Sequence, residues 1–216
     1  MKHRKLSGLD HLLIGVDRVV RSVSHGSTHA QQPSPADAAD DADNSLSEEE
    51  KQHIAALMRI NHTGEVCAQA LYQGQALTAR QADIKESMAE SAREEEDHLA
   101  WCEARIAELD GRTSHLNPLF YALSFGVGAL AGVAGDKWSL GFVAATEEQV
   151  CHHLREHLEK LPANDHKTRA ILNKMLSDEA QHGNKALDAG GVEFNPQAKA
   201  LMTAVSKLMT KTTYRI

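Results

Sequence analysis

The stretch AREEEDHLAW, residues 92–101, places four acids and a histidine in succession inside a segment with helical periodicity. A run of charges usually marks the solvated face of a helix. Here, however, the apolar stripe, which advances in steps of three and four residues, passes through Glu95, and His98 lies one turn further along the same face. The stripe comprises Met88, Ala92, Glu95, Leu99, Cys102, Ile106 and Leu109. We therefore predict that Glu95 and His98 point into the core.

Three other long segments repeat this pattern, each with one carboxylate in an otherwise largely apolar stripe. The stripes are Met58, Asn61, Glu65, Ala68 and Tyr72 in the first segment, Val143, Glu147, Val150, Leu154, Leu158 and Leu161 in the third, and Leu172, Met175, Glu179, His182 and Ala186 in the fourth. The periodicity selects Glu147 over its neighbour Glu148. His182 follows Glu179 at the same spacing that separates His98 from Glu95.

Four buried carboxylates require compensation, because each buried charge costs several kcal/mol even after relaxation. Two divalent cations would cancel four negative charges, and the two histidines would supply neutral nitrogen ligands. A Glu from each of two helices, together with Glu-x-x-His from each of the other two, is the ligand set of di-iron carboxylate bundles. The predicted metal ligands are Glu65, Glu95, His98, Glu147, Glu179 and His182.

The spacing along the chain supports a shared site. The midpoint of the Glu65–Glu95 pair is residue 80, and the midpoint of the Glu147–Glu179 pair is residue 163. Both midpoints fall where a helical hairpin is predicted to turn. Residues equidistant from the turn of an antiparallel hairpin lie at the same height, so all six ligands can meet in one layer.

Glu-x-x-His by itself is a weak signal, because Glu50 and His53 match it as well. That copy lies at a predicted helix start, where Glu50 is better explained by a capping box with Ser47. Two further copies, each preceded by a stripe glutamate 30 or 32 residues earlier, are much harder to obtain by chance.

The composition favours one all-α domain. The 216 residues suffice for a sizeable core, aromatic residues make up only 4%, and no proline occurs between residues 36 and 117. The predicted elements are helices at 47–80, 83–111, 138–161 and 165–189, an apolar crossover at 119–135 and an amphipathic terminal segment at 196–216. We expect a ferritin-like four-helix bundle with a di-metal site in its core and these appendages.

The N-terminal part divides into two pieces ahead of the main domain at 46–216. Residues 1–23 form an amphipathic segment with a basic flank. Residues 24–45 are polar and acidic, which predicts a disordered linker. Residues 24–50 carry seven acids and neither Lys nor Arg, so they account for the whole net charge of −7. The three cysteines are scattered, which indicates reduced intracellular thiols.

Four stretches resemble a known family: RINHTGEVCAQALYQGQA (59–76), EEEDHLAWCEARI (94–106), ATEEQVCHHLREHL (145–158) and DEAQHG (178–183). They are similar to the motifs of the demethoxyubiquinone hydroxylases, membrane-associated di-iron monooxygenases of ubiquinone biosynthesis. The resemblance covers residues 47–216. The linker at 24–45 is where this chain departs from shorter members of the family, and it touches none of these motifs.

The resemblance implies roles for individual residues. The six predicted ligands match the family's iron ligands, and Glu95 and Glu179 match the two carboxylates that bridge both irons. His153 matches a histidine near the site, although a surface position on its helix is an equal alternative. The implied reaction is O₂-dependent hydroxylation of a polyprenylated demethoxyubiquinol ring. Two iron ions supply the O₂ chemistry that side chains cannot perform, and NADH or the quinol itself would donate electrons.

A polyprenyl substrate resides in a bilayer, so a membrane-facing surface is expected. The apolar run at 119–135 is short for a spanning helix, which needs roughly 20 residues. Five of the nine aromatic residues lie between 120 and 142, a placement typical of an interface. These features, with the basic C-terminal segment, predict a peripheral, monotopic protein on the cytoplasmic face of a bacterial inner membrane. The alternative is a crossover buried against the bundle.

Other functions remain to be separated from this one. A ferritin-like ferroxidase or iron-binding protein would share the ligand set, but it would have no use for an apolar, aromatic-flanked crossover. A di-iron tRNA hydroxylase would need a basic face to bind RNA. Residues 51–190 are net acidic, so we expect no nucleic-acid partner. Candidate protein partners are other ubiquinone-biosynthesis proteins and a second copy of this chain.

Overall fold

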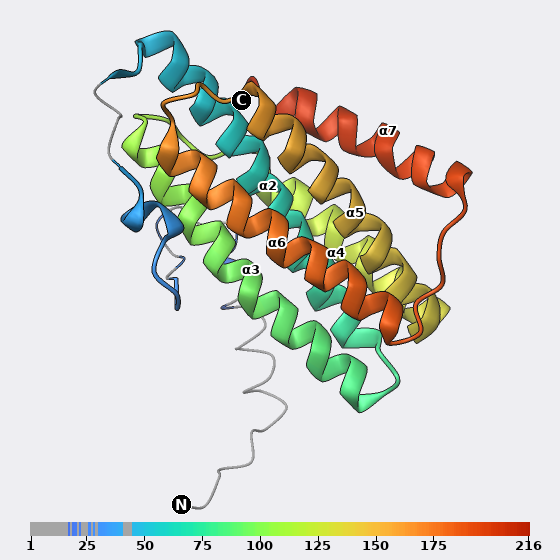
Figure 1. Ribbon diagram of the computed structural model, residues 1–216. Coiled ribbons are helices and arrows are strands. Elements are labelled where there is room, and N and C mark those ends of the chain that lie inside the picture. Colours follow the sequence, from blue (N-terminus) through green and yellow to red (C-terminus); the bar gives the residue numbers. More distant parts are fainter. Residues whose placement is uncertain are drawn as a thin grey trace, which may run out of the picture.

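The computed structural model describes residues 17, 19, 20, 22, 26, 28, 30–40 and 45–216. In this part of the chain the elements are the short 3₁₀ helix η1 (Pro35–Ala38) and the helices α2 (Glu48–Thr78), α3 (Ala82–Glu108), α4 (Asn117–Ala134), α5 (Asp136–Lys160), α6 (His166–Asp188) and α7 (Pro196–Thr213). Helix α2 pairs with α3 and α5 pairs with α6 to form the bundle, and α4 and α7 pack outside it (Figure 1). The predicted all-α four-helix bundle is confirmed.

The ends of the helices agree with one predicted local signal and differ from another. Ser47 and Glu50 form the predicted capping box: Ser47 Oγ accepts from Glu50 N at 3.2 Å, and Glu50 Oε2 accepts from Ser47 N at 2.8 Å. The predicted stop of α3 at Gly111 is wrong in detail, because the helix ends at Glu108 and Asp110 takes the positive φ of 54°. Gly111 is instead required by close packing, since a Cβ there would lie 2.9 Å from Ala55 Cβ.

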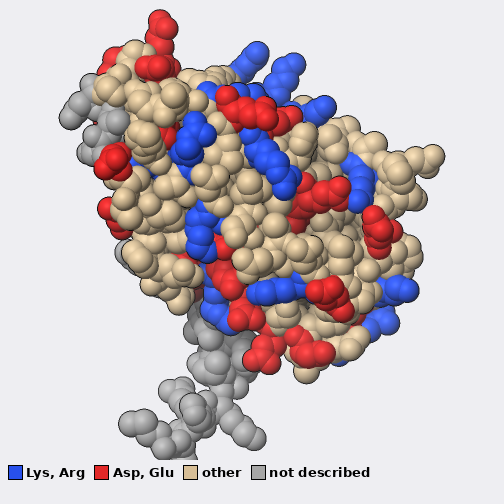
Figure 2. All heavy atoms as spheres, viewed as in Figure 1, with Lys and Arg blue, Asp and Glu red and all other residues tan. Residues whose placement is uncertain are grey.

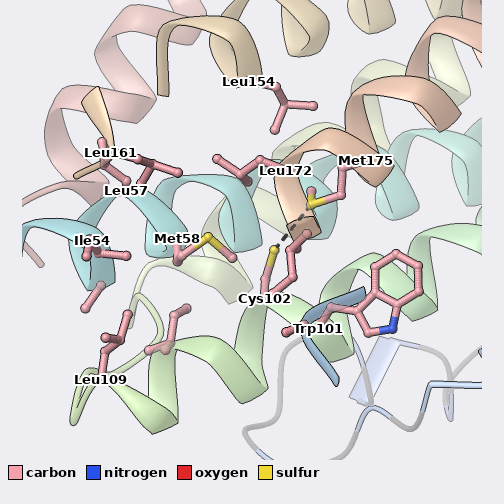
Figure 3. Packing of buried hydrophobic residues seen from close by; sticks show 14 of the residues in the cluster. Ile54, Leu57, Met58, Trp101, Cys102, Leu109, Leu154, Leu161, Leu172 and Met175 are labelled. Carbon is pink, nitrogen blue, oxygen red and sulfur yellow. Dashed lines mark hydrogen bonds between the residues drawn. The ribbon is translucent and has the colours of Figure 1, made fainter. Parts of the chain in front are cut away.

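Two apolar clusters fill the bundle, one on each side of the acidic stripe positions. The larger cluster joins the start of α2, the end of α3, the end of α5 and the start of α6 (Figure 3); its labelled members are Ile54, Leu57, Met58, Trp101, Cys102, Leu109, Leu154, Leu161, Leu172 and Met175. The second joins the opposite ends of the same helices: Ala68, Tyr72, Ile84, Met88, Ala92, Leu140, Val143 and Ala186. Each stripe carboxylate therefore lies between these clusters along its helix.

Helix α4 crosses α2 so closely that only glycine fits at the contact. A Cβ at Gly128 would lie 2.9 Å from Leu71 Cα and closer still to Leu71 O. A Cβ at Gly74 would lie 2.7 Å from Ala129 N. By length and composition α4 could cross a membrane, and only 22% of its apolar window is buried, at this crossing. The apolar run is therefore a crossover packed on the bundle by one face.

We expect Gly128→Ala to destabilise the protein, because the new methyl group meets backbone atoms that cannot rotate away. The cost should be about 1–3 kcal/mol, as for other overpacked sites. Gly126→Ala on the same helix is the matched control, since a Cβ there meets nothing within 4 Å. It should gain up to about 1 kcal/mol from helix propensity. Chemical denaturation of both variants measures the difference, and equal stabilities would contradict the close crossing.

Residues 30–40 differ from the predicted disordered linker. Gln31 N donates to Asp97 Oδ1 of α3 at 2.5 Å, η1 packs on α6, and Ala36 is buried in the larger apolar cluster. Asp97 of α3 thus accepts hydrogen bonds from the backbone of Gln31 and Gln32, an arrangement that the polar composition of this segment does not reveal. The predicted amphipathic segment at 1–23 lies outside the described residues, except for residues 17, 19, 20 and 22.

The face formed by α3 and α6 carries Lys and Arg interspersed with Asp and Glu (Figure 2). The large exposed apolar side chains lie mainly elsewhere, on the outer faces of α4 and α7. On α4 they are Leu119, Leu123, Val127, Leu130 and Val133, and on α7 they are Leu201, Val205 and Leu208. Both sets follow helical spacing, so each outer helix presents one continuous apolar strip.

Candidate metal centre

The six predicted ligand residues converge in one buried layer of the bundle. Their ligand atoms form two groups, and within each group all atoms lie within 4.8 Å of one another. The first group is Glu65, Glu95, His98 and Glu179, and the second is Glu95, Glu147, Glu179 and His182. Glu95 and Glu179 belong to both groups. This geometry can hold two adjacent cations that share the carboxylates of Glu95 and Glu179.

Periodicity distinguishes Glu147 from Glu148, and the two side chains lie in different surroundings. Glu147 is 2% exposed, and its Oε1 accepts a hydrogen bond of 2.5 Å from the Tyr72 hydroxyl. The side chain of Glu148 is 62% exposed and pairs with Lys199 of α7. Glu147 is therefore the member of this pair that reaches the core.

Both histidines direct Nδ1 towards the carboxylates. Nδ1 of His98 lies 3.1 Å from Glu95 Oε2 and 3.0 Å from Glu179 Oε1. Nδ1 of His182 lies 3.3 Å from Glu95 Oε1 and 3.4 Å from Glu179 Oε2. Each imidazole thus faces both shared carboxylates, one from either side.

The outward nitrogens of the histidines contact two acids that the sequence reasoning missed. Nε2 of His98, on α3, lies 3.1 Å from Asp178 Oδ2 of α6, and Nε2 of His182, on α6, contacts Glu94 of α3. A proton held on Nε2 by these acids leaves Nδ1 free to bind a cation, the usual outer-sphere role of a carboxylate. The sequence does contain a signal for these two acids, because Glu94 and Asp178 directly precede the Glu-x-x-His motifs of α3 and α6.

Burial and the neighbouring charges shift the pKa values of several groups in this cluster. Burial, followed by the charge of Glu179, raises the pKa of both Glu65 and Glu147. For His182, burial lowers the pKa, but Glu179 and Glu95 outweigh it and raise the pKa to about 12. These shifts favour the protonated forms of Glu65, Glu147 and His182, and metal binding at such ligands is expected to release protons.

The unsatisfied atoms of the cluster test whether cations fit there. Among the described side chains, Glu95 Oε1, Glu147 Oε2, both carboxylate oxygens of Glu179 and His182 Nδ1 lack a partner in hydrogen-bond geometry. Buried polar atoms are normally satisfied. Four carboxylates and two imidazoles suit two first-row divalent metal ions such as iron. The residues of the cluster therefore fit a pair of such ions.

His153 lies outside this cluster. It is half-buried, its Nε2 is 3.0 Å from Ser206 Oγ of α7, and its ring neighbours are those of His152 and His157. These contacts put it at the boundary between α5 and α7.

A narrow polar cavity of about 60 Å³ reaches the cluster between α3 and α6. Its lining includes both histidines, the acids Glu94 and Asp178, and Gln32 from the segment that precedes η1. Two or so water molecules would fill this volume. The cavity is therefore a solvent approach to the outer side of the histidines, not a pocket for a ring-sized substrate.

The family model of Ubiquinone biosynthesis protein COQ7 matches residues 52–213, which include all six cluster residues. The chain belongs to the COQ7 family. Relatives of this COQ7-family chain include a 3-demethoxyubiquinol 3-hydroxylase of Pseudomonas syringae pv. syringae (strain B728a), 57% identical, and one of Ectopseudomonas mendocina (strain ymp), 58% identical. Both matches cover 99% of this chain and 98% of the relative.

A solved structure also resembles this COQ7-family chain. It is the dodecameric thioferritin, a bacterioferritin-related protein, of Bacteroides fragilis, with a TM-score of 0.54 and 20% identity. The match covers 68% of this chain and 87% of that chain. At this identity the likeness concerns the fold, and it confirms the ferritin-like bundle.

Proposed function

We propose that this chain is a di-iron monooxygenase that hydroxylates the benzoquinol ring of a polyprenylated demethoxyubiquinol during ubiquinone biosynthesis. The observation that carries the proposal is the buried layer of four carboxylates and two imidazoles in a chain of the COQ7 family. Its relatives, matched over nearly their whole length, are named 3-demethoxyubiquinol 3-hydroxylase. We assign Glu65, Glu95, His98, Glu147, Glu179 and His182 as the iron ligands, with Glu95 and Glu179 shared.

The reaction would use O₂ as co-substrate, placing one oxygen atom on the ring and releasing the other as water. Two electrons and two protons are needed, and NADH or the quinol is the donor. When bound, the iron pair supplies the O₂ activation. The chain's own residues orient and protect the site: Glu94 and Asp178 hold the imidazoles, Tyr72 holds Glu147, and the apolar clusters on either side exclude water.

Attachment to a membrane surface is part of the proposal, because a polyprenyl chain partitions into lipid. The apolar strips on α4 and α7 support it: Leu130 and Leu208 are each 71% exposed. Cys67 on the outer face of α2 lies 3.9 Å from Met209 of α7 and near Ser124 of α4, so the two outer helices flank the same face of the bundle. We propose a peripheral protein on the cytoplasmic face of a bacterial inner membrane.

Iron content and a quinone profile test the hydroxylase assignment together. We expect about two irons per chain, as in other bundles with this ligand set, and a demethoxy-quinone intermediate in lipid extracts from cells that lack the gene. Two irons with an unchanged quinone profile would favour the second candidate, a ferroxidase, which the ferritin-like fold also permits. Absence of iron would overturn both assignments.

Leu130→Glu tests the membrane surface. Because a buried leucine contributes about 1.5–3 kcal/mol, we expect the charge to weaken binding to lipid vesicles at least tenfold. Leu187→Glu on α6 is the control, since Leu187 is exposed but lies on the charged side of the bundle. Vesicle sedimentation measures both variants. Equal binding by the two would argue against α4 as the attached surface.

A further inference from the structure

A second, larger cavity lies at the end of the bundle, away from the carboxylate layer. Its volume is about 770 Å³, within the range of small-molecule sites. Three segments line this cavity, which is open to solvent: the first turns of α2, the loop after α3 and Tyr214 at the C-terminus. Its polar lining includes Arg59 and Arg112, and its apolar lining consists of Ala55, Ala56 and Leu109.

Backbone carbonyls hold the Arg59 guanidinium in place. Its Nε donates to Arg112 O at 2.6 Å, and its Nη1 donates to Tyr214 O at 3.2 Å. The Tyr214 hydroxyl in turn lies 2.8 Å from His53 Nδ1. Arg59 is half-buried, and burial followed by the charge of Arg112 lowers its pKa. The Arg59 guanidinium is therefore held beside the loop that carries Arg112, and the two positive charges lie close enough to repel each other.

The carboxylates at this cavity do not compensate that repulsion. Glu49 and Asp110 line it as well, but among residues 45–216 neither is within ion-pair distance of a guanidinium. Arg112 is exposed and forms no ion pair with any residue that the structure describes. Elsewhere in the chain a buried guanidinium does meet its acid, as Arg105 meets Asp165. The pair at this cavity is left without an anion.

We propose that this cavity binds a phosphate-bearing ligand, with the phosphate held by Arg59 and Arg112. A phosphate group carries close to two negative charges near neutral pH, and its oxygens match the planar donors of guanidinium. The volume exceeds that of a phosphate alone. The remainder of the ligand would lie against Ala55, Ala56 and Leu109.

Two sources could supply this group, a soluble phosphate compound or the headgroup of an anionic lipid. Helix α7, which carries one of the two apolar strips, ends beside the cavity at Tyr214. A headgroup at the edge of the proposed membrane surface would therefore reach it. The shared chemistry is the phosphate, and the experiment must separate the sources.

Calorimetry on the full chain with inorganic pyrophosphate tests the soluble source, and vesicles with or without phosphatidylglycerol test the lipid source. We expect Arg112→Gln to weaken phosphate-dependent binding about tenfold, the effect of one charged hydrogen bond. Arg112 is exposed, so this variant should fold normally. Arg155→Gln, an exposed arginine of α5, is the control for net charge and should bind as the wild type does.

The outcomes are distinct. Pyrophosphate binding that depends on Arg112 identifies a soluble ligand. A preference for phosphatidylglycerol that depends on Arg112, without pyrophosphate binding, identifies a headgroup. If neither arm depends on Arg112, or if Arg155→Gln has the same effect, the proposal is overturned. Because binding is measured and not hydroxylation, this result stands apart from the proposed function.

Discussion

Glu147→Ala is expected to remove iron from the purified protein and to lower hydroxylation at least about 100-fold. Loss of a residue that merely supports a metal ligand already costs 10- to 100-fold, and a direct ligand should cost more. Glu147 closes one of the two ligand groups, beside the shared Glu95 and Glu179. Helix content should be unchanged, because the variant removes a buried carboxylate and leaves the apolar stripe of α5 intact. Metal analysis, circular dichroism and an activity assay measure the three effects.

Glu148→Ala is the matched control, one residue further along the same helix. It removes the same group, but from an exposed side chain whose partner is Lys199 on α7. An exposed ion pair contributes about 0–1 kcal/mol, so iron content and activity should remain near those of the wild type. Full iron loading in Glu147→Ala, or equal losses in both variants, would contradict the assigned ligand set.

Arg105→Ala is expected to cost about 3–5 kcal/mol of folding free energy, because it leaves a buried carboxylate without its counter-charge. The Arg105 side chain is fully buried near the end of α3. It donates to Asp165 Oδ1 at 3.1 Å and to Thr168 Oγ1 at 2.9 Å, and Asp165 also caps α6 by accepting from Thr168 N. This one guanidinium therefore ties α3 to the start of α6. Thermal unfolding should show a Tm lower by roughly 10 °C.

A second substitution separates the lost charge from the lost packing. In Arg105→Met with Asp165→Asn the buried charge is gone, and asparagine still caps α6. The double variant should be less destabilised than the sum of the single variants. Arg155→Ala, on the exposed side of α5, should change stability by less than about 0.5 kcal/mol. If the stability losses of the two single variants add up to the loss in the double variant, the Arg105–Asp165 ion pair contributes no coupling energy to stability.

The centre of the candidate site could be predicted from the sequence because helical periodicity is a local property. Residues three and four apart share a face whatever the rest of the chain does. The stripes therefore placed Glu65, Glu95, Glu147 and Glu179 inward, and the hairpin midpoints set them at one height. The structure brings these four carboxylates and both histidines together.

The surroundings of the site depend on contacts between helices that periodicity does not determine. Glu94 and Asp178 sit beside stripe residues, yet their partners are histidines on the opposite helix, 88 and 80 residues away. The acids of the charge run also divide by direction: Glu95 faces the core, Glu94 faces His182, and Asp97 accepts from the backbone of Gln31. Periodicity already sets Glu95 apart, but only the packing of α3 against α6 and the N-terminal segment separates the roles of Glu94 and Asp97.

The sequence by itself thus determined the helices, their inward faces and the six residues of the central layer, since each follows from neighbours within one or two turns. Tertiary structure decided which helix lies beside which, how closely α4 approaches α2 at Gly128, and that residues 30–40 fold onto α3 and α6. It also placed Arg59 beside Arg112, which are 53 residues apart. These features rest on long-range contacts, whose partners are specified by the packing of the whole chain.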